Sequence, residues 1–229
     1  MRVAVVAGPD PGHAFPAIAL CRRFAAAGDD PILFTGDRWL ADAACEGIPA
    51  QLLKGLAPRP VDDDGDLGQR MHQRAAYMAT ELVPDLAAVR PDVVVSDVLT
   101  ACGGLAAEKI DVPWAELSPH PLYEPSKGLP PIGSGLEPGV GFKGRVRDSL
   151  LRAATARSIR RGKAQRGVAR KGIGLPTVGA GPDLKLIATL PALEVPRPDW
   201  PSTAHVVGPL HWEPTEQIGR AVQQECRDR

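Results

Sequence analysis

A histidine stands at the first point in this sequence where an apolar run gives way to a glycine- and proline-containing stretch. Val3, Val5 and Val6 form the β-branched run expected of a buried strand, and Pro16 begins an apolar pattern of helical spacing. His13 lies between them and is predicted to occupy a short loop before the helix. Such a loop lies at the carboxyl end of a strand, where open α/β sheets bind ligands.

An aspartate ends the most strand-like stretch of the chain. Asp97 follows the residues VVVS at positions 93–96, in a strand that a doubly wound order places close to the first. A carboxylate bonded to one imidazole nitrogen fixes the tautomer and leaves the other nitrogen free to accept a proton. His13 and Asp97 therefore predict a general base that acts on a hydroxyl group. The alternative for His13 is a helix-capping or water-exposed side chain.

The elements that would position these two residues alternate along the chain. Strands are predicted at residues 3–6, 31–35, 49–53, 93–96, 113–117, 184–190 and 205–207, and helices at residues 16–24, 37–45, 67–89, 100–109 and 145–170. This alternation predicts an α/β fold, a Rossmann-like, doubly wound and mainly parallel sheet of about seven strands. On the 67–89 helix, Met71, Met78 and Leu82 share one side and are predicted to be core residues.

Composition narrows the class of protein. The formal net charge is zero, which gives no indication of nucleic-acid binding, but residues 1–140 carry 11 basic and 19 acidic side chains and residues 141–229 carry 16 and 8. The four cysteines are scattered without a CxxC pair, so neither a metal site nor a disulfide framework is expected. No signal sequence or spanning segment of ~18 apolar residues is evident. These features favour a reduced, cytoplasmic protein.

Three stretches of the sequence resemble, in the right order, the amino-terminal half of family 1 glycosyltransferases of the GT-B fold. They are GxxPGHAFPAIALCRRFAAAGDDPILFTGDR, PDVVVSDVLTACGGLAAEKIDVPWAELSP and HVVGPL, and together they cover nearly the whole chain. This family includes bacterial glycosyltransferases of natural products and glycolipids. The resemblance implies an inverting transfer of a sugar from a nucleotide-diphosphate donor to a hydroxyl of a small-molecule or lipid acceptor, with no cofactor.

The same resemblance assigns roles to residues. It implies that His13 is the general base and that Asp97 orients it. It also implies that the Pro- and Gly-rich loop of residues 119–142 shapes the acceptor pocket. The substrate-binding residues expected on this basis are Gly12, His120, Leu122, Tyr123, Leu129 and Ile132, with Leu136 as a further candidate. The alternative is a structural loop whose apolar residues only anchor it.

Residues 143–171 carry a basic excess, with Asp148 as the one acid in this stretch. A solvated helix face is the default interpretation. Such an imbalance also suits an anionic lipid surface or an anionic acceptor, so a weak peripheral contact with the inner membrane face stays open. The interleaved Ala, Ile and Leu residues are expected to face the core.

The chain departs from the family pattern after HVVGPL, because no donor-binding stretch follows. We expect a Rossmann-like acceptor-binding domain at residues 1–210, followed by a linker and helical tail at residues 211–229. The carboxy-terminal donor-binding domain is absent, so this chain alone is expected to be inactive. It would be a fragment or a half-enzyme that pairs with another chain. A non-catalytic acceptor-binding or regulatory module that needs a partner chain is the alternative.

A dinucleotide-dependent oxidoreductase domain is a third interpretation. Asp37, after the second strand, resembles the acid that holds a ribose hydroxyl. The first loop argues against this reading because GPDPGH lacks the GxGxxG spacing. Pro9 and Pro11 also remove backbone donors that a pyrophosphate would need.

Overall fold

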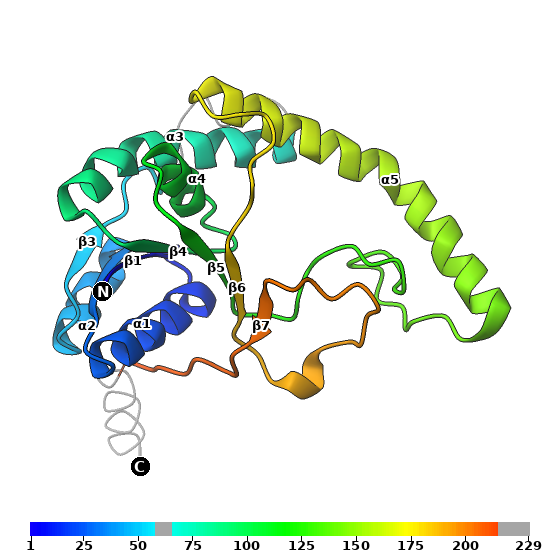
Figure 1. Ribbon diagram of the computed structural model, residues 1–229, viewed down its shortest axis with the longest axis horizontal. Helices are drawn as coiled ribbons and strands as arrows, with labels where there is room; N and C mark the ends of the chain where they lie inside the picture. The colour runs from blue at the N-terminus through cyan, green and yellow to red at the C-terminus, as the bar shows by residue number, and fades with distance from the viewer. Residues whose placement is uncertain (58–65, 215–229) are drawn as a thin grey trace, which may run out of the picture.

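A computed structural model describes residues 1–57 and 66–214 of the chain (Figure 1). In these residues seven parallel strands form one sheet in the order β3-β2-β1-β4-β5-β6-β7. The strands are β1 (Arg2–Val6), β2 (Asp30–Thr35), β3 (Ala50–Leu52), β4 (Val93–Asp97), β5 (Trp114–Ser118), β6 (Leu184–Ile187) and β7 (Ala204–Val206). The predicted Rossmann-like, doubly wound parallel fold is confirmed.

Helices cover both faces of the sheet. The helical elements are α1 (Pro11–Ala26), η1 (Asp37–Trp39), α2 (Leu40–Cys45), α3 (Leu67–Val89), α4 (Cys102–Lys109), α5 (Gly141–Gly172) and η3 (Pro191–Leu193). Val3 and Val5 of β1 pack with α1 and α2 on one face, whereas Ala4 and Val6 pack with α3 and α4 on the other. Successive residues of β1 thus supply two separate cores.

The chain order reverses between β1 and β4, which lie side by side in register, Val3 opposite Val93 and Val6 opposite Ser96. Two glycines of α4 allow that helix to lie close to β1, β4 and the neighbouring β5. A Cβ atom on Gly103 would come within 2.9 Å of Val6 and 2.7 Å of Ser96, and one on Gly104 would come within 2.7 Å of Trp114. The carboxyl ends of β1 and β4 therefore form the switch-point crevice of the sheet.

Helix α5 is a long arm that leaves the body of the molecule (Figure 1). Its carboxyl end packs beside α3 and α4, where the buried Arg170 pairs with Glu108. Its amino-terminal part is different: Phe142, Val146 and Leu150 are exposed, with 77% of Phe142 open to solvent. The interleaved Ala, Ile and Leu residues were predicted to face the core, and this prediction is wrong for Leu150, because this part of the arm has no sheet beneath it.

Several boundaries differ from the predicted ones. The 37–45 helix divides into η1 and α2, the 184–190 strand ends at Ile187, and the 145–170 helix spans Gly141–Gly172. The predicted tail helix of residues 215–229 lies outside the described residues. Among the described residues, no helix combines the length and the apolar character that a bilayer crossing needs.

Residues 208–214, predicted in part as a linker, pack against the body of the molecule. Leu210, Trp212 and Pro214 are buried and alternate with the exposed His211 and Glu213. This alternation is that of an extended segment with one face on a core. The packed region therefore continues past residue 210, the predicted domain boundary, to Pro214.

Candidate active site

His13 lies inside the first turn of α1, not in a loop before it. The helix begins at Pro11, whose missing N–H is no loss at this position, and the predicted start at Pro16 is wrong. The carbonyl of Asp10 accepts hydrogen bonds from the backbone N–H groups of His13 (3.0 Å) and Ala14 (2.9 Å). The first turn of α1 thus carries the imidazole to the crevice beside β4.

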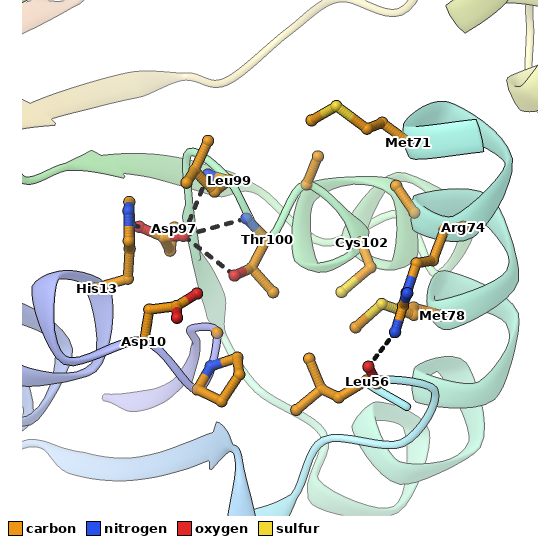
Figure 2. Close-up of a pocket in the computed structure, with 14 residues that line it drawn as sticks. Asp10, His13, Leu56, Met71, Arg74, Met78, Asp97, Leu99, Thr100 and Cys102 are labelled. Carbon is orange, nitrogen blue, oxygen red and sulfur yellow. Dashed lines mark hydrogen bonds and ion pairs between the residues drawn. The ribbon is translucent and has the colours of Figure 1, made fainter. Parts of the chain in front are cut away.

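The imidazole of His13 contacts the carboxylate of Asp97, and Figure 2 shows the two side chains facing each other. Nδ1 of His13 lies 2.6 Å from Oδ1 of Asp97. The Asp97 side chain is 1% exposed and that of His13 is 15% exposed. Because a carboxylate only accepts hydrogen bonds, Nδ1 carries the proton and donates it, and Nε2 is left as a proton acceptor.

The second oxygen of Asp97 is held by the start of the next helical segment. Oδ2 accepts hydrogen bonds from the backbone N–H of Leu99 (3.1 Å) and from the backbone N–H and hydroxyl of Thr100 (3.1 and 3.0 Å). These donors fix the plane of the carboxylate while Oδ1 faces His13. The pair has the arrangement of a base and the group that orients it.

A cleft of about 310 Å³ opens beside the pair. Its walls come from the β1–α1 turn, the segment after β3, one side of α3 and the β4–α4 turn (Figure 2). Apart from His13 and Asp97, the cleft is lined mainly by apolar groups, including Leu56, Met71, Ala75, Met78, Leu99, Ala101 and Cys102. The cleft therefore suits a largely apolar molecule that presents a hydroxyl to the imidazole.

Arg74 is the charged side chain that α3 contributes to the wall of the cleft. Its guanidinium donates hydrogen bonds to the carbonyl oxygens of Gly55 (3.3 Å) and Leu56. Figure 2 shows the side chain extending from α3 towards Leu56. Arg74 thus fixes the segment that follows β3 against α3 and shapes one edge of the cleft.

The structure separates the other predicted site residues from His13. Tyr123 and Ile132 line a second cavity, of about 470 Å³, between the loop before α5 and α5 itself. Leu122 is buried in a small core with Ile187 and Ala204. Each therefore lies outside the cleft that contains the imidazole, because the loop runs along α5 instead of folding over the strand ends.

Three further candidates also lie outside the His13 cleft. Ring nitrogen Nδ1 of His120 lies 3.2 Å from the hydroxyl of Ser118 and 3.0 Å from the carbonyl of Pro121. The carbonyl of Leu129 accepts a hydrogen bond from Arg152. Gly12 lines a separate groove between α1 and residues 209–213. Leu136, the additional candidate, is exposed.

The sequence interpretation missed the α3 wall of the cleft. Met71 and Met78 were predicted as core residues. Met78 is buried in the core as predicted and also lines the cleft, whereas the prediction is wrong for Met71, which is exposed on the cleft wall. Leu82 is a core residue as predicted. A signal was present: Met71, Arg74, Ala75 and Met78 repeat at three- and four-residue spacing, so one face of the helix combines flexible apolar groups with a cation.

A thiol also lines the cleft, but it is not a nucleophile. Burial raises the pKa of Cys102 to about 12, and the neighbouring Asp97 charge acts in the same direction. The thiol is therefore neutral near pH 7, whereas a reactive cysteine needs its thiolate. In the described part of the chain, no three His, Cys, Asp or Glu side chains are grouped as metal ligands.

We compared the sequence and the fold of this chain with those of known proteins. No protein-family model matches the chain. A curated protein, 4'-demethylrebeccamycin synthase of Lentzea aerocolonigenes, is 26% identical over 91% of this chain and 56% of its own length. The chain thus spans little more than half of that relative.

Two solved structures share the fold. The glycotransferase of kitacinnamycin matches with a TM-score of 0.66 and 19% identity over 94% of this chain and 53% of its own. The glycosyltransferase SsfS6 of Streptomyces sp. SF2575, complexed with thymidine diphosphate, matches with a TM-score of 0.52 and 18% identity, over 84% of this chain and 50% of its own. The chain therefore has the fold of about half of each of these two glycosyltransferases, and its sequence is similar to that of 4'-demethylrebeccamycin synthase.

Proposed function

We propose that this chain is the acceptor-binding half of an inverting glycosyltransferase in which His13 is the general base. The observation that carries the proposal is the 2.6 Å contact between Nδ1 of His13 and Asp97 at the edge of an apolar cleft. The sequence likeness to a natural-product enzyme and the shared fold of SsfS6, which was solved with thymidine diphosphate, support it.

The proposed step begins with the acceptor hydroxyl hydrogen-bonded to Nε2 of His13. As the hydroxyl oxygen forms a bond to the anomeric carbon of the donor sugar, its proton passes to Nε2. The bond from the anomeric carbon to the diphosphate breaks on the opposite face, and its electron pair leaves with the nucleoside diphosphate. Attack from the face opposite the leaving group inverts the anomeric centre. Asp97 stabilises the imidazolium that results.

The cleft indicates the class of acceptor. Met71, Met78 and Leu99 offer apolar surface, and methionine side chains adapt their shape to a ligand. We propose an acceptor with a predominantly apolar body and a hydroxyl directed towards His13. The donor nucleotide is assigned to a second, carboxy-terminal half, because relatives of this chain are about twice as long.

Substitution of the dyad tests the proposal in an enzyme that includes a donor-binding half. We expect His13→Ala to lower kcat by ~10²–10⁴-fold with acceptor affinity nearly unchanged, because a general base acts in the transition state. Asp97→Asn should give a smaller, clear loss. The measurement is steady-state transfer with acceptor binding by calorimetry.

His205→Ala is the matched control, since His205 is an exposed histidine on β7. It should leave kcat unchanged. Near-normal turnover in His13→Ala would contradict the assignment of the base. Acceptor binding without any transfer, in the presence of a competent donor half, would instead favour the acceptor-binding or regulatory module.

A second contact is favoured by the exposed face of α5. Phe142, Val146 and Leu150 repeat every four residues on the arm and are open to solvent. The helix carries a basic excess in Lys143, Arg145, Arg147, Arg152, Arg157, Arg160, Arg161, Lys163, Arg166, Arg170 and Lys171. An apolar strip flanked by cations is the pattern of an interfacial helix. We therefore propose a weak peripheral contact of residues 143–171 with anionic lipid.

A further inference from the structure

The segment of residues 208–214, here called the strap, returns from β7 across α1 and the η1–α2 region (Figure 1). Leu210 and Trp212 of the strap belong to the same core as Ile18 of α1 and Ala43 of α2. Trp212 is 4% exposed, and its indole N–H donates a hydrogen bond of 2.8 Å to Glu46. The other carboxylate oxygen of Glu46 pairs with Arg22 of α1 at 3.1 Å. The strap is therefore fixed to the helix that carries His13.

Three aromatic rings meet where the strap crosses α1. The ring centroid of Phe15 lies 5.0 Å from that of Trp39 and 5.1 Å from that of Trp212, with an edge-to-face angle of 79° in both pairs. Trp39 and Trp212 are 6.4 Å apart at 88°. Edge-to-face pairs stabilise one mutual orientation of the rings, in addition to the stabilisation that comes from burial of their apolar area. Phe15, Trp39 and Trp212, called here the aromatic cluster, thus join the strap to the second residue after His13.

The aromatic cluster also holds the turn that precedes His13. The indole N–H of Trp39 donates a hydrogen bond of 2.6 Å to the carbonyl of Pro9, and the Thr35 hydroxyl donates to the carbonyl of Gly8 at 3.4 Å. A Cβ atom on Gly36 would come within 2.7 Å of Pro9. The turn is thus bound by residues 35–39, and the residue that follows it, Asp10, is the N-cap of α1.

We propose that Trp212 is a positioning residue for the His13 imidazole. The Trp212 ring packs against Phe15 and Trp39. These two residues fix the first turn of α1 and the chain turn before it, and the first turn of α1 carries His13. Loss of the Trp212 ring would leave α1 free to shift, and the 2.6 Å contact of His13 with Asp97 would lengthen. That Trp212 orients the imidazole does not depend on the proposed glycosyl transfer. The effect of Trp212 on turnover does rest on the proposed glycosyltransferase function.

Nitrogen NMR of the histidine rings tests the proposal on the 229-residue chain. In the neutral imidazole of the wild type we expect the proton to lie on Nδ1 of His13 and not on Nε2. Trp212→Leu should move both nitrogen shifts towards the average of a free imidazole, which exchanges between tautomers. Trp39→Phe keeps a ring but loses the indole bond to Pro9, and it should cause a change in the same direction.

Trp200→Phe is the matched control. Its indole also donates to a carbonyl, that of Ala204 at 2.9 Å, in a core remote from α1. It should leave the His13 shifts unchanged. If Trp212→Leu does not fold, as judged by its unfolding transition, Trp39→Phe still decides the question. Wild-type His13 shifts in a folded Trp39→Phe or Trp212→Leu chain would overturn the proposal.

Kinetics then separate this proposal from the proposed function. In an enzyme with a donor-binding half, we expect Trp212→Leu to lower kcat by about tenfold and to leave the acceptor KM nearly unchanged, because misplacement of the base affects only the reacting geometry. Altered His13 shifts without glycosyl transfer by the wild type would contradict the function and retain the positioning role. Transfer at the wild-type rate with unaltered shifts would contradict the positioning role alone.

Discussion

The two carboxylate oxygens of Asp97 face donors on both sides. Oδ1 faces Nδ1 of His13, and Oδ2 faces two backbone N–H groups and the hydroxyl of Thr100. An asparagine at this position must turn its NH₂ group towards one of these sets of donors. In either orientation the amide NH₂ group points at another hydrogen-bond donor. Asp97→Asn should therefore disturb the imidazole, although the substitution keeps the shape of the side chain.

The cysteines of the described residues should differ sharply in reactivity. Burial raises the pKa of both Cys21 and Cys102 to about 12, so their thiols stay protonated until far above pH 8. Cys45 is exposed. We expect iodoacetamide at pH 8 to modify Cys45 in the native chain and to leave Cys21 and Cys102 unmodified, as measured by peptide mass spectrometry. Labelling of all three after denaturation is the control, and native labelling of Cys102 would contradict the buried thiol.

At this scale the sequence located His13 and Asp97 because each follows a strand of unmistakable apolar pattern. Both strands are central, so their carboxyl ends meet at one edge of the sheet. It did not place Tyr123 or Ile132, because the path of a Pro- and Gly-rich loop depends on tertiary contacts that no periodicity encodes. Met71 was assigned to the core because a cleft wall and a core surface have the same apolar spacing.

Among the elements, α5 is held at one end by a buried ion pair. The guanidinium of Arg170 binds both oxygens of Glu108 at 3.0 and 2.6 Å and donates to the carbonyl of Pro176 at 2.7 Å. We expect Arg170→Met to lower the free energy of unfolding by about 3 kcal/mol, because Glu108 is left without its partner. Chemical denaturation measures the change. The double variant Arg170→Met, Glu108→Gln should recover part of the lost free energy of unfolding. A single variant that is more stable than the double variant would contradict this account.

The free end of α5 should bind anionic vesicles. We expect the chain to sediment with vesicles that contain phosphatidylserine, and less so as salt increases, because the attraction is partly electrostatic. Replacement of Phe142, Val146 and Leu150 by serine should abolish the effect. Val178→Ser is the matched control, since Val178 is an exposed apolar residue outside α5. Equal binding by the serine variant, or no binding to anionic vesicles, would contradict the lipid contact.

The sequence predicted the order of the elements better than their limits. Apolar strands flanked by proline and glycine were found because both faces of the sheet are covered, which forces a continuous apolar pattern. The direction of α5 could not be predicted, since a helix that leaves the body retains the same local spacing as one that packs on it. The division at η1 depends on the contact of Trp39 with Pro9, which is not local.

For the whole molecule, we propose that this chain binds the acceptor and that a second half binds the donor. This proposal predicts that the chain alone binds the donor weakly. The cleft at His13 is mainly apolar, and the groups that would hold a pyrophosphate are assigned to the second half. We expect calorimetry of the 229-residue chain with UDP- and dTDP-sugars to detect no micromolar site. The same titration on an enzyme with the donor half is the positive control. Micromolar binding by this chain would contradict the assignment of the donor to another half.

The packed strap has a consequence for enzymes assembled from exchanged halves. A natural place to join two parent sequences is the end of the last strand, β7, at Val206. A junction there would replace Trp212 with the other parent's residue, and the ring that supports Phe15 and Trp39 would be lost wherever that residue is not aromatic. A junction after Pro214 retains the native ring beneath the histidine. Hybrids with the two junctions would contain the same His13 and Asp97 but would differ in how well the position of the His13 imidazole is fixed.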